Sequence, residues 1–293
     1  MRPRLISVTI SILSAHLLES NEVSNTTLGN FTDIQVSLDA FVATVEIQRP
    51  PLNFFDQALI EQIGDALTEL DDTTACRVVV LCSDGRAFCA GANFGTGQED
   101  GSGSTDFTEE GFQNTTGKLY QAGVRLFRSK KPIVGAIQGA AIGGGLGLAL
   151  VPDFRVASPA ARFGANFVKL GIHQGFGLSV TLPRLIGQQA ASNMLLTGRR
   201  VSGNEALQMG LVDQLVDADE LRPTALRLAQ DIAENAPLAV ESVRATLRDG
   251  LADAVASATD HELKEQQRLR ATADAYEGIR AVSERRRGNF NAN

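Results

Sequence analysis

Two glycine-rich segments, each directly after a short apolar run, constrain the fold of this chain more than any other feature. One spans residues 85–93 and follows an apolar run at 77–81; the other spans 139–147 and follows a run at 133–137. Short runs rich in Val and Ile predict buried strands. Glycines directly after a strand allow tight turns in which a ligand can touch the backbone. The pattern therefore predicts an α/β core with backbone-lined turns at the ends of strands.

The rest of the chain supplies the helices and strands that such a core needs. Alternating apolar residues at 34–38 and 41–47 predict a β-hairpin turning at Asp39 and Ala40, and 154–157 predicts a further strand. Apolar residues at helical spacing predict helices over 59–70 and 118–127. After about Asp219 the composition is helical, with Pro223 and Pro237 near predicted helix starts. We expect a flexible N-terminal extension over 1–30, an α/β core over 31–218 and a helical region over 219–293.

Composition excludes several classes of function. The net charge of −7 and the pI of about 5.1 argue against nucleic acid as a partner. The three cysteines include no Cys-x-x-Cys pair, so we expect neither disulfides nor a metal site, and we place the protein in a reducing compartment, the cytoplasm. No segment approaches the ~18 apolar residues of a membrane span. The apolar run at 5–18 is interrupted by polar residues and lacks an Ala-x-Ala cleavage site, so we interpret it as an extension rather than a signal peptide.

The two glycine-rich turns fit an oxyanion hole better than the common nucleotide-binding motifs. A dinucleotide fingerprint beginning at Gly143 or Gly145 would need Gly or Ala where Leu148 or Leu150 stands, and no P-loop occurs. The segment after Gly177 lacks the closing glycine of a nucleophile elbow. Two converging turns would present backbone N–H groups to the negative charge that develops on a thioester carbonyl oxygen. The alternative interpretation is close packing of helix on strand, for which glycine is also common.

The order and spacing of these and other motifs resemble the crotonase (enoyl-CoA hydratase/isomerase) superfamily. The resemblance covers about residues 31–290 and rests on segments 86–93, 131–132, 139–145, 163–164, 171–177, 182–187, 196–199, 274–278 and 284–286, with Asp153. It implies a spiral of ββα turns followed by a helical trimerisation region, in a homotrimer or dimer of trimers. It also implies a CoA thioester of fatty acid metabolism as substrate, with no cofactor beyond its coenzyme A moiety.

The resemblance also implies roles for single residues. The amides of Ala92 and Gly144 would form the oxyanion hole. Arg86, Ala90, Gly91, Phe94 and Gly143 would contact the coenzyme A thioester, with the Arg86 cation available for a phosphate.

The chain departs from the superfamily pattern at the acid–base positions. The two glutamates of the hydratases fall at Gly147 and Phe167, and carboxylates used elsewhere in the family fall at Asn93 and Gly175. Without them, ordinary hydration of an enoyl thioester lacks its acid–base pair. His173 is the candidate base that remains, unless its ring is hydrogen-bonded within its own loop. Acidic residues between 99 and 110 are a further possible source of an acid.

Two functions therefore stay open at this point. One is an enzyme with altered acid–base residues. The other is a non-catalytic acyl-CoA binding or scaffolding protein that retains the hole. The position of the His173 ring, inside or outside the acyl pocket, discriminates between them.

Overall fold

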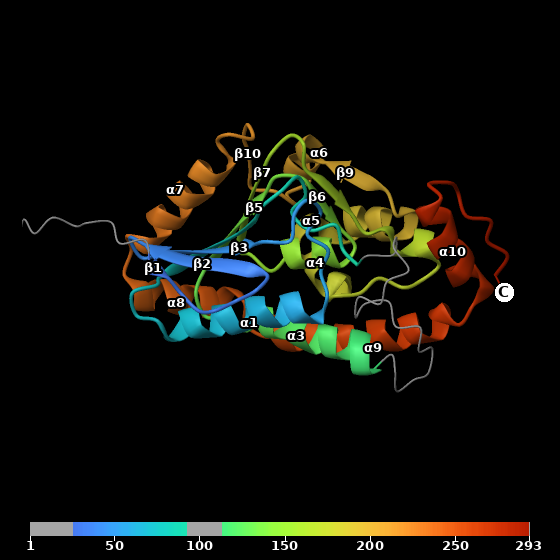
Figure 1. The fold of residues 1–293 in the computed structure, drawn as a ribbon, viewed down its shortest axis with the longest axis horizontal. Helices are drawn as coiled ribbons and strands as arrows, with labels where there is room; N and C mark the ends of the chain where they lie inside the picture. The colour runs from blue at the N-terminus through green and yellow to red at the C-terminus, as the bar shows by residue number, and fades with distance from the viewer. Residues whose placement is uncertain (1–25, 93–112, 293) are drawn as a thin grey trace, which may run out of the picture.

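A computed structural model describes residues 26–92 and 113–292, and its largest element is a seven-stranded sheet (Figure 1). The strand order is β1-β2-β3-β4-β5-β7-β10. From β3 onward neighbouring strands are parallel, whereas β1, β2 and β3 pair antiparallel. The strands are β1 (Thr26–Thr27), β2 (Ile34–Asp39), β3 (Val42–Ile47), β4 (Val78–Ser83), β5 (Ile133–Ile137), β7 (Phe154–Ala157) and β10 (Gln214–Leu215).

A second sheet of three short strands lies beyond the ends of the first. It contains β6 (Ala140–Ile142), β8 (Arg162–Gly164) and β9 (Arg200–Ser202), in the order β6-β8-β9. The chain passes from β5 directly into β6 and from β7 into β8, so successive turns alternate between the sheets. After β4, Cys89 makes an isolated parallel bridge with Ala141 in the same way. Helices separate these turns, and this is the predicted spiral of ββα units.

Both faces of the large sheet are covered at its centre, which explains why β4 and β5 are continuous apolar runs, whereas β2 nearer the edge alternates. One face packs on α1 (Gln57–Asp72) and α3 (Lys118–Leu126) through a core that includes Val45, Leu81 and Ile137. The other face packs on α7 (Leu221–Ala233) through a separate cluster with Val80 and Val134.

The predicted strands and helices at the core are confirmed, with small differences at their ends. β5 and β7 have the predicted bounds, and α1 extends the predicted helix by two residues at each end. Asp56 caps its N-terminus, accepting from Leu59 N at 2.9 Å. The hairpin turns at Ala40 and Phe41, not at Asp39 and Ala40. Both turn residues have positive φ, which takes Phe41 out of the strand in which the alternation placed it.

Residues 26–30, assigned to the extension from the sequence, already belong to the fold. Thr26 and Thr27 pair with β2, and Leu28 N donates to Val36 O at 2.9 Å. Residues 1–25 lie outside the described residues.

The C-terminal part of the chain is helical, as predicted. Its helices are α7, α8 (Pro237–Leu247), α9 (Leu251–Arg270) and α10 (Ala273–Ser283). Pro237 begins α8, whereas Pro223 is the third residue of α7. The remaining helices are η1 (Gln113–Gly117), α4 (Gly144–Ala149), η2 (Asn166–Leu170), α5 (Leu178–Thr197) and α6 (Gly203–Gln208). In Figure 1, α9 runs beside α3 beneath the sheet and α10 stands at the end of the molecule away from β1.

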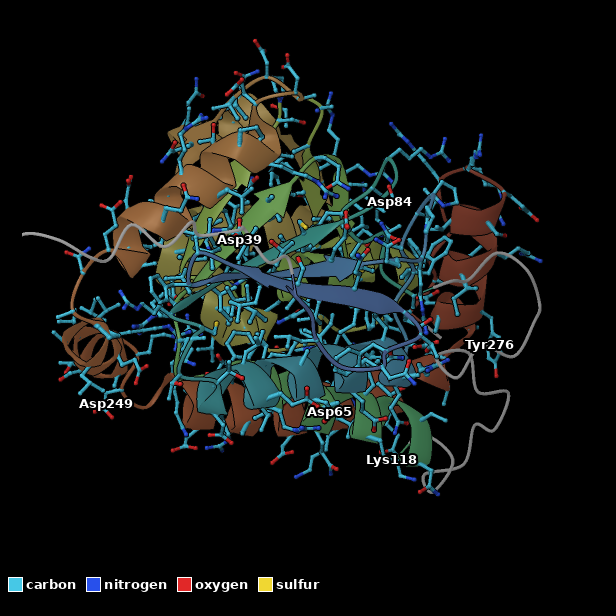
Figure 2. All side chains as sticks on the ribbon, turned by 60° about the vertical axis from the view of Figure 1, so that its left-hand side comes forward. Asp39, Asp65, Asp84, Lys118, Asp249 and Tyr276 are labelled. Carbon is cyan, nitrogen blue, oxygen red and sulfur yellow. The ribbon has the colours of Figure 1, made fainter. Side chains whose placement is uncertain are left out.

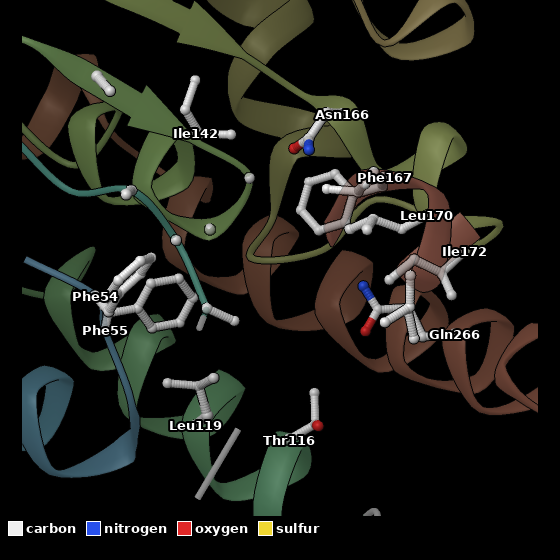
Figure 3. A pocket seen from close by; sticks show the side chains of 18 of the residues that line it. Phe54, Phe55, Thr116, Leu119, Ile142, Asn166, Phe167, Leu170, Ile172 and Gln266 are labelled. Atoms are coloured by element: carbon white, nitrogen blue, oxygen red, sulfur yellow. The ribbon is translucent and has the colours of Figure 1, made fainter. Parts of the chain in front are cut away.

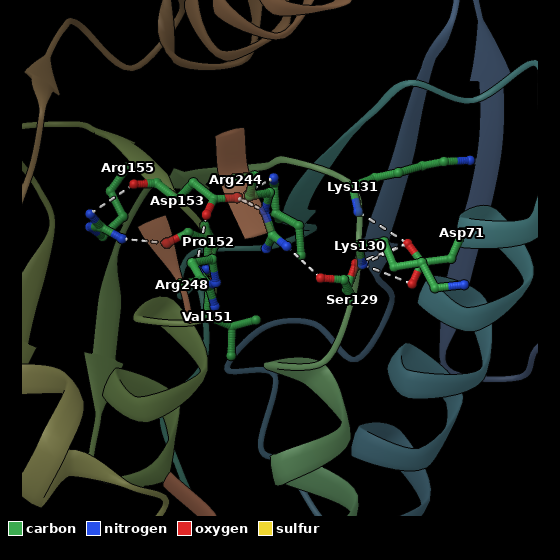
Figure 4. A network of polar contacts seen from close by, with 11 residues as sticks. Asp71, Ser129, Lys130, Lys131, Val151, Pro152, Asp153, Arg155, Arg244 and Arg248 are labelled. Atoms are coloured by element: carbon green, nitrogen blue, oxygen red, sulfur yellow. Dashed lines mark hydrogen bonds and ion pairs between the residues drawn. The ribbon is translucent and has the colours of Figure 1, made fainter. Parts of the chain in front are cut away.

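A buried ionic network fastens α8 to the large sheet (Figure 4). The Asp153 carboxylate accepts from Arg244 Nε at 2.8 Å, from Arg248 Nη1 at 2.9 Å and from the Ile133 N–H at 2.8 Å. Removal of Asp153 would leave two arginines without their shared counter-charge, which makes this a structural rather than a catalytic carboxylate.

Other charged side chains, such as Asp65, Asp84, Lys118 and Asp249, lie on the surface (Figure 2), whereas Lys131, Arg155 and Glu262 are buried. Within residues 26–92 and 113–292, no helix is long and apolar enough to cross a membrane. In the same ranges no group of three or more His, Cys, Asp or Glu side chains is arranged to hold a metal ion.

Candidate active site

The two glycine-rich turns are joined by backbone hydrogen bonds. Cys89 N donates to Ala140 O at 3.0 Å, and Ile142 N donates back to Cys89 O at 3.1 Å. The turns approach so closely that a Cβ atom at Gly91 would lie 2.6 Å from Ile142 O, and Gly91 has φ +83°. Only glycine meets both demands, so the sequence requirement at Gly91 follows from convergence of the turns.

This convergence brings the amide of Gly144 close to Gly91, the residue before Ala92. The Gly144 nitrogen is 3.9 Å from the position that a Gly91 Cβ would occupy, and Ala92 is the next residue. Gly144 is the first residue of α4, where an N–H has no partner within the helix. Among the described residues, neither of these two N–H groups donates to a backbone carbonyl.

A pocket of about 440 Å³ opens beside the two turns (Figure 3). Its walls come from segments far apart in sequence: the 52–55 segment, both turns, η2 and the helices α3, α9 and α10. Its described lining residues are Leu52, Phe54, Phe55, Ala90, Gly91, Ala92, Thr116, Leu119, Tyr120, Ala140, Ile142, Gly143, Gly144, Asn166, Phe167, Leu170, Ile172, Arg200, Gln266, Arg270, Ile279, Val282 and Ser283. The set is predominantly apolar, as expected for an organic ligand.

No aspartate or glutamate is among these described lining residues. The space beside Gly147 is filled instead: a Cβ there would lie 2.6 Å from Cδ1 of Phe176. At the second acid–base position the side chain of Phe167 lines the pocket, with 9% of its surface exposed. Aromatic rings therefore stand where the family resemblance implies carboxylates.

Tyr120 fills the space beside Gly175, a third position at which the family resemblance implies a carboxylate. Its hydroxyl oxygen would lie 1.7 Å from a Cβ at Gly175, and its ring packs edge-on against Phe176 with centroids 6.4 Å apart. Burial raises the pKa of Tyr120 well above its ordinary value, and the nearby Glu262 raises it further. The phenol is thus neutral at physiological pH.

The structure brings together five of the eight residues that the sequence nominated. Ala90, Gly91, Ala92, Gly143 and Gly144 all line the pocket. Arg86 is exposed and is not a lining residue, so its contact with a CoA phosphate stays a prediction. Phe94 lies outside the described residues, as do Asn93 and the acidic residues between 99 and 110.

His173 is placed apart from this group. Its ring is not in the pocket lining but meets the ring of His261 edge-on, with centroids 5.8 Å apart. Its Nδ1 lies 2.8 Å from the carbonyl oxygen of Gln174, the arrangement that the sequence left open as the alternative to a base. The neighbouring Ile172 takes the place in the pocket wall. The geometry does not support His173 as the base, and by the criterion stated above this favours the non-catalytic alternative.

Sequence reasoning did not find the lining residues of α3, α9 and α10. Gln266 and Arg270 are four residues apart, so they share one face of α9. Only the packing of α9 against α3 turns that face toward the pocket. No local pattern distinguishes it from an ordinary polar helix face.

Comparison with known proteins agrees with this architecture. Residues 38–293 match the family model described as enoyl-CoA hydratase/isomerase. The chain is 32% identical over 264 residues to a crotonyl-CoA hydratase from Syntrophomonas wolfei, covering 89% of this chain and 98% of that protein. It is 33% identical over 250 residues to a carnitinyl-CoA dehydratase from Proteus mirabilis, covering 84% and 93%.

Solved structures show the same fold. An enoyl-CoA hydratase/isomerase from Pseudoalteromonas atlantica superimposes with a TM-score of 0.75 at 28% identity, covering 89% of this chain and all of that chain. Sequence, fold and the converging turns agree, and this chain belongs to the enoyl-CoA hydratase/isomerase family of the crotonase superfamily.

Proposed function

We propose that this protein binds an acyl- or enoyl-CoA thioester and polarises its carbonyl group between the amides of Ala92 and Gly144. The observation that carries the proposal is the convergence of two hydrogen-bonded turns on an apolar pocket, with both amides unused by described backbone carbonyls. Two N–H donors at a thioester oxygen stabilise the negative charge that it acquires in an enolate, and one such donor contributes about 3 kcal/mol in other enzymes.

The chemistry beyond polarisation differs from ordinary hydration. Addition of water to an enoyl thioester needs one group to deliver a proton and one to activate water. Gly147 and Phe167 supply neither. We therefore propose an enzyme of this family that stabilises a thioester enolate and hydrates crotonyl-CoA weakly.

A second candidate is a non-catalytic acyl-CoA binding or scaffolding protein. It is favoured by the placement of His173 against His261 and by the lack of a carboxylate among the described lining residues. The relatives with enzymatic names favour the first candidate.

Both candidate functions require binding of a thioester through its carbonyl group. Calorimetry with a matched pair of ligands tests this binding. Butyryl-CoA carries the carbonyl, whereas S-butyl-CoA is a thioether of the same length without it. We expect butyryl-CoA to bind at least ~10-fold more tightly, because only it accepts from the two amides. Equal affinity would exclude the oxyanion hole, and no binding of either ligand would exclude the proposed function.

Turnover of an acyl-CoA panel then separates the two candidates. Enzyme-dependent conversion of any thioester supports the first, whereas tight binding without conversion supports the second. Exchange of the thioester α-proton with deuterated water is the most sensitive readout, since enolate formation alone produces it.

A further inference from the structure

Aromatic side chains are concentrated around the candidate active site. Phe, Tyr and Trp make up 5% of the chain, whereas four of the 23 described lining residues are Phe or Tyr. These four are Phe54, Phe55, Tyr120 and Phe167. Phe55 and Phe167 are 5% and 9% exposed. Aromatic rings, rather than apolar surface in general, thus distinguish this pocket from the rest of the chain.

Phe55 and Phe167 flank the second glycine-rich turn, one ring beside each of two consecutive glycines. A Cβ atom at Gly144 would collide with Cζ of Phe55. A Cβ atom at Gly143 would lie 3.7 Å from Cζ of Phe167. Figure 3 shows the two rings on opposite sides of the pocket. A carbonyl group that accepts from the Gly144 N–H is therefore bordered by both rings, and so are the carbons attached to it.

Backbone hydrogen bonds and packing hold both rings in place. Phe55 N donates to Gly91 O at 3.1 Å, which ties Phe55 to the first glycine-rich turn. The Phe55 ring also packs against the ring of Phe176, with centroids 5.8 Å apart. On the other side of the pocket, Ile172 N donates to Phe167 O at 3.1 Å. The space between the two rings is thus formed before a ligand binds, which lowers the entropic cost of binding there.

The place of Phe167 relative to the chemistry supports an aromatic ligand. Its ring lies where the family resemblance implies a glutamate, which in a hydratase serves the carbons next to the thioester carbonyl. A phenyl ring cannot transfer a proton, but it offers a flat apolar surface to a group on those carbons. Aromatic rings attract one another in edge-on and offset-stacked arrangements, in addition to the effect of the buried area. A saturated chain buries area at this place but makes no such contact.

We infer that the acyl group of the thioester carries an aromatic ring, which binds between Phe55 and Phe167. The inference rests on the proposed function and names its substrate class: an aryl-substituted acyl thioester whose ring is attached to the first or second carbon after the carbonyl group. Such a ring fits the available space. A cavity of about 150 Å³ accepts benzene in another protein, and this pocket measures about 440 Å³.

The adenine of coenzyme A is the other ring on such a ligand. A diphosphate and the pantetheine arm separate adenine from the thioester, so adenine and the carbonyl group occupy different places. Ligands that share coenzyme A and differ only in the acyl ring separate the two sources, because adenine contributes equally to the binding of both.

Calorimetry with two matched pairs tests the inference: phenylacetyl-CoA against cyclohexylacetyl-CoA, and 3-phenylpropanoyl-CoA against 3-cyclohexylpropanoyl-CoA. Each pair shares one carbon skeleton, and only one member is aromatic. The wild-type protein should bind the aromatic member of at least one pair about fivefold or more tightly. Phe167→Leu and Phe55→Leu, which keep an apolar side chain, should each reduce that preference by about twofold or more. Phe154→Leu, at an exposed ring outside the pocket lining, is the control and should leave the preference unchanged.

Each other outcome has a definite meaning. Equal or tighter binding of the cyclohexyl members by the wild type would overturn the inference while leaving the proposed function intact, and this comparison needs no variant to fold. An equal loss of affinity for both members of a pair in Phe167→Leu and Phe55→Leu would assign these rings to general packing or to adenine, and would overturn it as well. Failure of butyryl-CoA and of all four thioesters to bind would instead overturn the proposed function.

Discussion

The ring of Phe176 occupies the space that a side chain at Gly147 would need, with Cδ1 of Phe176 2.6 Å from the position of a Gly147 Cβ atom. The same ring lies 2.8 Å from the Cβ position of Gly123 on α3, so two glycines make room for it. Phe176 itself has φ +61°, a conformation unusual for an aromatic residue. The carboxylate that the family resemblance implies at position 147 is thus replaced by the packed ring of Phe176, not by empty space.

Gly147→Glu alone should therefore fail to create a hydratase. We expect no gain in crotonyl-CoA hydration and a stability loss of about 1–3 kcal/mol, because the new side chain collides with Phe176. Adding Phe176→Gly removes the ring and suits the positive φ. The double variant should gain activity of at most ~10²–10⁴-fold, the contribution of one acid–base group.

Loss of enoyl-thioester absorbance and urea unfolding measure the two effects. Phe176→Gly alone is the control and should not hydrate faster than the wild type. Efficient hydration by the Gly147→Glu single variant would show that the aromatic packing does not block this position.

His173→Gln should leave acyl-CoA binding and any turnover within about twofold. The reason is geometric: the ring contacts His261 outside the pocket lining, and a base must come within hydrogen-bonding reach of its proton. The measurement is the pH profile of α-proton exchange in both proteins. Loss of exchange together with loss of a titration near neutral pH would restore His173 as the base, whereas unchanged exchange directs the search to the acidic residues between 99 and 110.

All three cysteines should resist alkylation in the folded protein. Cys76, Cys82 and Cys89 are buried, and burial raises their pKa values from about 9 to about 11, 12 and 12. At pH 8 the reactive thiolate is then ~10⁻³ or less of each thiol. Iodoacetamide followed by mass spectrometry should find no label in the native protein and three labels in urea.

The same shifts have a consequence for stability. Between pH 9 and 11 the folded state holds more protons on these thiols than the unfolded state does, so stability falls as pH rises through that window. In the alkylation experiment, rapid labelling of Cys89 in the native protein would contradict the packing of the 85–93 turn against β6.

Glu262→Gln should destabilise the protein by about 1–3 kcal/mol. The buried carboxylate accepts from both Gly177 and Ser179, whereas an amide can accept with its oxygen but turns a donor toward the other N–H. Glu265→Gln is the matched control three residues later, where the ion pair with Arg268 is exposed to solvent and contributes little to stability. Equal midpoints of urea unfolding for the two variants would disprove a special role for Glu262.

The protein should assemble as a trimer or a dimer of trimers. The family resemblance of the C-terminal region implies this, and Val243 and Leu247, on one face of α8, are 59% and 68% exposed in the isolated chain. Sedimentation velocity at micromolar concentration measures the state directly. A stable monomer would refute the prediction, and Leu247→Glu should shift the equilibrium toward smaller species if this face is the interface.

Local patterns in the sequence predicted the sheet core and the convergent turns, but not the whole site. β5 is buried on both faces, so its apolar run has the same bounds in sequence and structure. Gly91 and Gly143 both have positive φ, and a Cβ atom at Gly91 would also collide with Ile142 O. By contrast, two features of the pocket depend on how α9 docks on α3 and on the loop before α5. The His173 ring lies outside the pocket lining, and Arg270 lies within it. Such long-range packing leaves no periodic trace in either segment.

The distribution of the pocket walls along the chain has a consequence for biosynthesis. Leu52 and Phe55 leave the ribosome more than 200 residues before Gln266, Ile279 and Val282. A nascent chain therefore cannot hold its ligand until α10 has docked, even if the sheet has formed. A cellular pool of a thioester ligand would selectively stabilise molecules in which α9 and α10 have docked.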